Sequence, residues 1–137
     1  MTLVREAMVP EPPALEGAAS AQEAGELLSR DEVRAVFVCD DGKLIGVVTR
    51  KTLVREIVAL GRDPRETRLA GIAEEPYLPI DASTELTAAF HLLEERDMER
   101  VPVTEEGRLV GVLSRSVLQR RLAEDAPSDD DEDQPPA

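Results

Sequence analysis

Residues 36–53 read VFVCDDGKLIGVVTRKTL and residues 101–118 read VPVTEEGRLVGVLSRSVL, so the chain contains one unit twice. The offset between the copies is 65 residues, without a gap. Between 24–55 and 89–120, 12 of 32 positions are identical, whereas chance would give about two. The duplication predicts two similar lobes related by a pseudo-twofold axis. A cleft on this axis would meet each element twice.

Each copy is predicted to contain a helix, a β-hairpin and a closing helix. In the first copy, Ser20 and Glu23 match a capping box that starts a helix. Strands are expected at 36–39 and 44–48, and a helix follows to residue 60. The second copy repeats this order, with strands at 101–104 and 109–113 and a closing helix at 116–123. The expected fold class is α/β, with two β-α-β-β-α repeats packed by pseudo-twofold symmetry.

The size of the chain also bears on its core. The chain has 137 residues, and a repeat of about 60 residues would be marginal by itself. We therefore expect the two repeats to share one core, built from Val, Leu, Ile and Ala because aromatic residues make up only 2% of the chain. We also expect the apolar run 44–48 to be buried on both faces.

The charge of the chain excludes some classes of partner. The net charge is −13, which repels phosphate backbones and argues against nucleic-acid binding. The segment 124–137 holds seven acidic and no basic residues and is predicted to be a disordered acidic tail. No apolar run reaches membrane-spanning length. The single cysteine, Cys39, fits a reducing compartment, so a cytoplasmic protein is expected.

The sequence also bears on catalysis and metal binding. His91 is the one histidine, and it lies on a predicted helix face that points to solvent. The sequence offers no nucleophile–base pair, no metal-ligand cluster and no P-loop glycine pattern. A protein that is not an enzyme and holds no metal is therefore expected.

Two short motifs resemble a known family. Residues 46–52 read GVVTRKT and residues 111–117 read GVLSRSV, while residues 100–103 read RVPV before the second hairpin. Each repeat resembles a CBS domain, named after cystathionine β-synthase, and the pair resembles a Bateman module. The resemblance implies domains at 3–61 and 68–123. It also implies a regulatory module that acts on a partner protein, whose identity the sequence does not give.

The resemblance implies two ligand clefts between the repeats. In the CBS family such clefts bind adenine-containing ligands, so AMP, ADP, ATP or S-adenosylmethionine is expected. Each cleft would combine the hydroxyl and basic residues of one motif with a wall from the other repeat. The implied residues are Thr49, Arg50, Lys51 and Thr52 with Tyr77 and Met98–Arg100 in one cleft, and Ser114, Arg115, Ser116 and Val117 with Pro12–Ala14 and Val33–Ala35 in the other.

The motifs depart from the family at one position. The family has an Asp that binds the ribose hydroxyls where this chain has Thr52 and Val117. The hydroxyls of Thr49 and Ser114 have two interpretations, since each could contact a ligand or cap the helix that follows. The alternative to ligand sensing is a degenerate pair that serves as a dimerisation or protein-docking scaffold.

The helices after the two motifs predict the assembly. Leu53, Val54, Ile57 and Val58, with Leu118 and Leu122 in the second repeat, make these helices too apolar for the surface of a monomer. Because CBS pairs dimerise through such helices, the resemblance implies a homodimer. The identical pair Arg55 and Arg120 is expected on the solvated helix surface.

Overall fold

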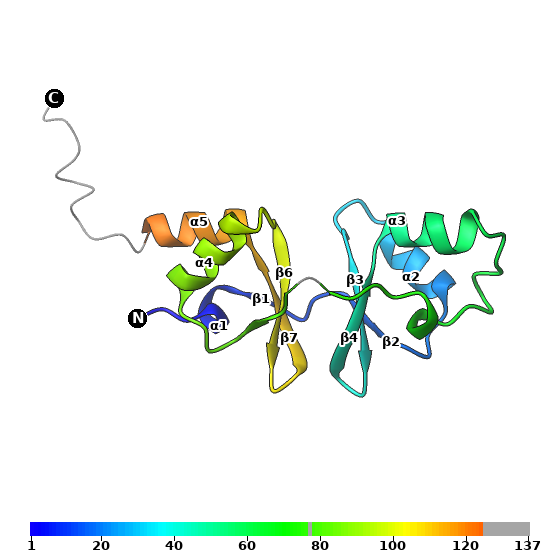
Figure 1. Cartoon of the computed structure of the whole chain (residues 1–137), viewed down its shortest axis with the longest axis horizontal. Coiled ribbons are helices and arrows are strands. Elements are labelled where there is room, and N and C mark those ends of the chain that lie inside the picture. Colours follow the sequence, from blue (N-terminus) through cyan, green and yellow to red (C-terminus); the bar gives the residue numbers. More distant parts are fainter. Residues whose placement is uncertain (77, 125–137) are drawn as a thin grey trace, which may run out of the picture.

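The computed structural model describes residues 1–76 and 78–124. Two similar lobes lie side by side, with their hairpins in the middle and their long helices outside (Figure 1). The α/β class and the repeat are therefore confirmed. The first lobe contains α2 (Ala21–Leu28), β3 (Val36–Asp40), β4 (Lys43–Val48), α3 (Arg50–Leu53) and its π-helical continuation η1 (Val54–Val58), and the second contains α4 (Leu86–Glu95), β6 (Arg100–Glu105), β7 (Arg108–Ser114) and α5 (Arg115–Glu124).

Five short elements complete the fold: α1 (Val4–Ala7), β1 (Val9–Pro10), β2 (Ala14–Glu16), η2 (Leu69–Gly71) and β5 (Ile80–Asp81). The sheet runs β2-β3-β4-β7-β6-β5, with β1 paired to β7. The two halves of this sheet join at Lys43 and Arg108, near the hairpin turns. Gly42 and Gly107 provide the positive φ angles of these turns, at 86° and 82°.

The segment that precedes each repeat packs on the opposite repeat. The N–H of Val4 donates to the carbonyl of Thr84 at 2.8 Å, and Val4 is fully buried in the core of the second lobe. The N–H of Leu69 donates to the carbonyl of Ala19 at 2.9 Å, and Leu69 is buried in the core of the first lobe. This exchange ties the two lobes together and repeats with the internal symmetry.

The prediction of one shared core is wrong, because each lobe has a core of its own. Side chains alternate between the two faces of a strand. In β3, Val36 and Val38 face the helices of their lobe and enter its core, whereas Phe37 between them faces the other lobe. In β6, Val101 and Val103 enter the core of the second lobe, whereas Pro102 between them faces the first lobe. The inner faces of the two halves of the sheet therefore border a cleft instead of merging into a core.

The exposure of single residues was also predicted from the sequence. Ile45 in β4 is 44% exposed, so this strand is not buried on both faces. Arg55 is exposed, as expected, and it pairs with Glu74 beside the cavity. Tyr77 and the predicted tail from Asp125 onward lie outside the described residues. Within the described ranges, no helix is both long and apolar enough to cross a membrane.

Candidate functional site

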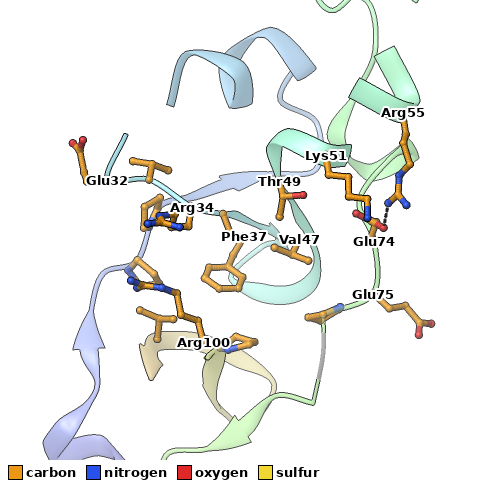
Figure 2. A pocket seen from close by; sticks show the side chains of 17 residues that line it. Glu32, Arg34, Phe37, Val47, Thr49, Lys51, Arg55, Glu74, Glu75 and Arg100 are labelled. Atoms are coloured by element: carbon orange, nitrogen blue, oxygen red, sulfur yellow. Dashed lines mark hydrogen bonds and ion pairs between the residues drawn. The ribbon is translucent and has the colours of Figure 1, made fainter. Parts of the chain in front are cut away.

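A cavity of about 410 Å³ lies between the two lobes. This volume falls within the usual range for small-molecule sites, roughly 300–1,000 Å³. Figure 2 shows its lining side chains. The lining residues are Pro12, Pro13, Glu32, Val33, Arg34, Ala35, Phe37, Val47, Thr49, Lys51, Arg55, Glu74, Glu75, Pro76, Arg100, Pro102 and Val112.

The apolar walls of the cavity come from equivalent strand positions of the two repeats. Phe37 and Pro102 are related by the 65-residue offset, as are Val47 and Val112. Each of these side chains points away from its own lobe's core because its strand neighbours occupy that core. The cavity is thus bordered by apolar side chains from both repeats.

Thr49 begins α3 at the edge of the cavity. Its Oγ1 accepts from the N–H of Thr52 at 3.3 Å, and the Oγ1 of Thr52 accepts from the N–H of Thr49 at 3.0 Å. This reciprocal pair is a capping box with Thr at both ends. Thr52 is fully buried, so the side chain at the position of the family's ribose-binding Asp does not reach the cavity.

Glu74 reaches the cavity from the segment that connects the two repeats. The Oγ1 of Thr52 donates to Glu74 Oε2 at 2.6 Å, and Arg55 pairs with Glu74 Oε1. The hydrogen bond from Thr52, followed by the bond and charge of Arg55 and the charge of Lys51, lowers the pKa of Glu74 although burial acts in the opposite direction. Glu74 is therefore ionised at neutral pH.

The backbone of Glu74 is fixed against β4. Its N–H and carbonyl exchange hydrogen bonds with Val47 at 2.9 and 2.8 Å. Gly46 makes this approach possible, because a Cβ there would lie 2.6 Å from the Cβ of Ala73 and 2.9 Å from the carbonyl oxygen of Glu74. The carboxylate is thus held in place by both its backbone and its side chain.

Two arginines, one from each repeat, line the opposite end of the cavity. Arg34 and Arg100 lie on one side of Phe37, whereas Lys51, Glu74 and Arg55 lie on the other side (Figure 2). Both arginines are exposed. In the part of the chain that the structure describes, neither guanidinium has a hydrogen-bond or ion-pair partner. They are available to an anionic group.

The second motif has its own carboxylate as a partner. Glu99 Oε2 accepts from the Oγ of Ser114 at 3.2 Å, and from the Oγ and N–H of Ser116 at 3.1 and 3.4 Å. The Nε of Arg115 lies 3.8 Å from Glu99 Oε1. Burial acts to raise the pKa of Glu99, but the bonds from Ser116 and Ser114 and the charge of Arg115 together lower it. This carboxylate occupies the N-terminus of α5.

The structure distributes the residues implied by the family resemblance over several places. Thr49, Lys51, Val33, Ala35 and Arg100 line one cavity. Val33 and Ala35 were expected opposite Ser114, and the structure instead places them with Thr49, because the loop before β3 borders the cleft of its own repeat.

The other implied residues have different surroundings. Arg50 donates to the carbonyl of Arg30 at 2.8 Å, and Ser114 and Arg115 contact Glu99. Met98 packs against the core of the second lobe. These side chains thus serve local contacts of their own repeats.

Several cavity residues were not identified from the sequence. Arg55 and Glu74 are charged examples, whereas Arg34 was expected with Val33 and Ala35 at the other cleft. The repeat contained one usable signal: Arg34 is equivalent to Glu99, so the two clefts differ in charge. Glu74 stands in a connecting segment without any motif, and its place could not be read from the sequence.

The described residues also bear on metal and thiol chemistry. Among the residues that the structure describes, no group of three or more His, Cys, Asp and Glu side chains could hold a metal ion. Cys39 is buried, and burial, followed by the charge of Glu16, raises the pKa of its thiol. This thiol is therefore poorly suited to nucleophilic chemistry.

Comparison with solved structures gives close matches to the fold. The crystal structure of Hypoxic Response Protein I with two coordinated zinc ions superposes with a TM-score of 0.75 at 26% identity and covers 89% of this chain and 100% of that one. The crystal structure of CBSX2 in complex with AMP superposes with a TM-score of 0.72 at 24% identity and covers 90% of this chain and 98% of that one.

Sequence comparison identifies the family. Hypoxic response protein 1 of Mycobacterium tuberculosis is 30% identical over 104 residues, which are 75% of this chain and 73% of that protein. CBS domain-containing protein YhcV of Bacillus subtilis is 24% identical over 114 residues, or 83% of this chain and 81% of that protein. The CBS domain family matches twice, at residues 4–59 and 69–124. The chain therefore belongs to the CBS domain family and carries two CBS domains in tandem, a regulatory and ligand-binding kind of module.

Proposed function

We propose that this CBS pair is a non-catalytic sensor that binds one adenosyl ligand in the cavity between its lobes. The ligand class comprises AMP, ADP, ATP and S-adenosylmethionine. The observation that carries the proposal is the composition of the cavity, with apolar strand faces from both repeats between a Thr49–Lys51–Glu74 end and an Arg34–Arg100 end. An adenine ring fits the apolar faces, and the polar ends suit a sugar and a phosphate. CBSX2, which has the same fold, binds AMP.

The two motifs are not equal in this proposal. The hydroxyl of Thr49 lies at the open cavity, whereas the hydroxyls of Ser114 and Ser116 already donate to Glu99. A ligand at the second motif would have to displace Glu99 from both serine hydroxyls, whereas Glu74 at the first motif bonds Thr52 and leaves Thr49 at the cavity. We therefore propose one ligand per chain, bound at the first motif.

A homodimer is the proposed assembly. Val54, Val58 and Leu60 are 55%, 72% and 57% exposed, and all lie on or directly after η1. Ile57 and Leu118, which were expected to share this apolar surface, are buried in their own lobes. The proposed contact is therefore confined to the helix after the first motif, where paired apolar side chains would be removed from water.

A thermal-shift screen of the full chain with AMP, ADP, ATP and S-adenosylmethionine tests the proposed function. A ligand at about 100 times its dissociation constant stabilises the folded state by about 2.7 kcal/mol, so at least one compound should raise the melting temperature. GTP at the same concentration serves as the control. If none of the four adenosyl compounds shifts the melting temperature at millimolar concentration, the scaffold alternative is favoured. The absence of the family's Asp at Thr52 and Val117 is the sequence feature that supports this alternative.

A further inference from the structure

The two ends of the cavity differ in hydrogen-bonding chemistry, because only one of them carries a carboxylate. Figure 2 shows Glu74 with Lys51 and Arg55 on one side of Phe37 and Val47, and Arg34 with Arg100 on the other. This difference determines which part of an asymmetric ligand, such as a sugar or a phosphate, binds at each end of the cavity.

The end at Glu74 presents the hydrogen-bond acceptors of Glu74 and Thr49 beside the ammonium group of Lys51. Thr52 has a single O–H, and this group donates to Glu74 Oε2 at 2.6 Å. The O–H in the 3.1 Å contact between the hydroxyls of Thr49 and Thr52 therefore belongs to Thr49. Thr49 consequently keeps only a lone pair for a ligand. The carboxylate of Glu74 keeps about two of its four acceptor positions, since Thr52 and Arg55 occupy the others.

The charges around Glu74 select among possible ligand donors. A phosphate cannot bond the Glu74 carboxylate or the lone pair of Thr49, because all of these groups are hydrogen-bond acceptors. An ammonium group gains little, since Arg55 and Lys51 already compensate the charge of Glu74. Two neighbouring sugar hydroxyls are neutral, donate two hydrogen bonds and match the two free positions.

The end at Arg34 and Arg100 presents hydrogen-bond donors without partners. Two guanidinium groups from opposite lobes offer up to ten N–H donors, five on each side chain. Planar guanidinium groups suit bidentate contact with phosphate oxygens. A phosphate is therefore drawn to this end, away from Glu74.

We infer that Glu74 recognises the ribose diol of the ligand and that Arg34 and Arg100 hold its phosphate. Thr52 and Arg55 act as positioning residues for the carboxylate. This inference rests on the proposed function, because it assumes that a nucleotide occupies the cavity. It assigns the sugar-recognising carboxylate to the segment between the repeats, outside both motifs.

Calorimetric titration with AMP and 2′-deoxy-AMP tests the role of Glu74. Wild type should bind AMP at least about tenfold more tightly, because a hydrogen bond to a charged group contributes roughly 1.5–3 kcal/mol. In Glu74→Gln, the two affinities, for AMP and for 2′-deoxy-AMP, should lie within about threefold of each other. The matched control is Glu75→Gln, which removes the same charge at the same cavity and should keep the wild-type ratio. A wild-type ratio near one overturns the inference without any variant, so the test does not depend on the folding of Glu74→Gln.

Titration with AMP and adenosine tests the other end. Arg100→Gln should weaken AMP binding about tenfold and change adenosine binding by less than about threefold. Equal weakening of AMP and adenosine overturns the assignment of the phosphate end. If wild type binds AMP but Glu74→Gln keeps the wild-type ratio of AMP to 2′-deoxy-AMP affinity, this inference alone is overturned. Failure of wild type to bind any adenosyl compound overturns the proposed function as well.

Discussion

Arg34 and Glu99 occupy equivalent positions of the two repeats, 65 residues apart, and carry opposite charges. Arg34 lines the cavity, and no other described residue pairs with it. Glu99 instead accepts hydrogen bonds from Ser114 and Ser116 at the start of α5. This difference leaves the guanidinium of Arg34 available to an anionic group in the first repeat, whereas the equivalent Glu99 bonds the second motif of its own repeat.

Thr49→Val should weaken AMP binding more than Ser114→Val does. Both hydroxyls bond the start of the helix that follows, so each substitution should cost about 1 kcal/mol of stability. Thr49 also lies at the cavity, whereas Ser114 faces Glu99. Calorimetry should show a loss of about tenfold or more in Thr49→Val and a change within about twofold in Ser114→Val. The reverse order would show that the second motif holds the ligand.

Glu99→Gln should lower the melting temperature at neutral pH. The pKa of Glu99 lies below its ordinary value of 4.5, so the ionised carboxylate stabilises the fold above that pH. This stabilisation is lost as the pH falls below 4.5 through the lowered pKa. The difference between variant and wild type should therefore shrink in acid.

Melting curves from pH 7 down to about pH 3 measure this difference. Glu95→Gln on α4 is the control, because within the described chain Glu95 has no side-chain partner. A melting-temperature difference in Glu99→Gln that stays constant over the whole pH range would contradict the role given to the carboxylate.

Gly46→Ala should destabilise the protein by roughly 1–3 kcal/mol. The added Cβ would meet the Cβ of Ala73 at 2.6 Å and the carbonyl oxygen of Glu74 at 2.9 Å, so the segment that carries Glu74 must move. Gly71→Ala meets nothing within 4 Å and should change stability by less than about 0.5 kcal/mol. Urea unfolding of both variants measures the two costs. Equal losses of unfolding free energy in the two variants would show that the close approach at Gly46 does not contribute to stability.

Val58→Asp should reduce the mass in solution from that of a dimer to that of a monomer. Val58 is 72% exposed in the single chain, so a charge there costs little in the monomer and much at an apolar interface. Ala88→Asp, at an exposed position on α4, is the control and should leave the dimer intact. Light scattering at micromolar concentration gives both masses. Wild type that already has the mass of one chain would contradict the proposed dimer.

The repeat and the periodicity of the apolar residues predicted most of the fold. The alternation of side chains between the two faces of β3 and β6 depends only on neighbouring residues. The same holds for the capping boxes at Ser20 and Thr49. The number of cores could not be predicted in this way, because it depends on which strand face each lobe covers with helices. The exchange of Val4 and Leu69 between the lobes is likewise a tertiary property.

The cavity was predicted less completely than the fold. Thr49 and Lys51 could be named because they belong to a repeated motif. Glu74 could not, since it reaches the cavity through its pairing with Val47 and the space left by Gly46. Arg34 and Arg100 become a pair only when the two lobes face each other. Residues that act across the pseudo-twofold axis thus need the structure to be recognised.

Calorimetric titration of the full-length wild type with AMP tests the central claim most directly. The account predicts saturable binding with one AMP per chain and a dissociation constant of tens of micromolar or weaker, because the motif carboxylates of the family are absent. Two equal sites per chain would contradict the role of Glu99, and the absence of heat with AMP, ADP, ATP and S-adenosylmethionine at millimolar concentration would contradict the claim that this CBS pair is a nucleotide sensor.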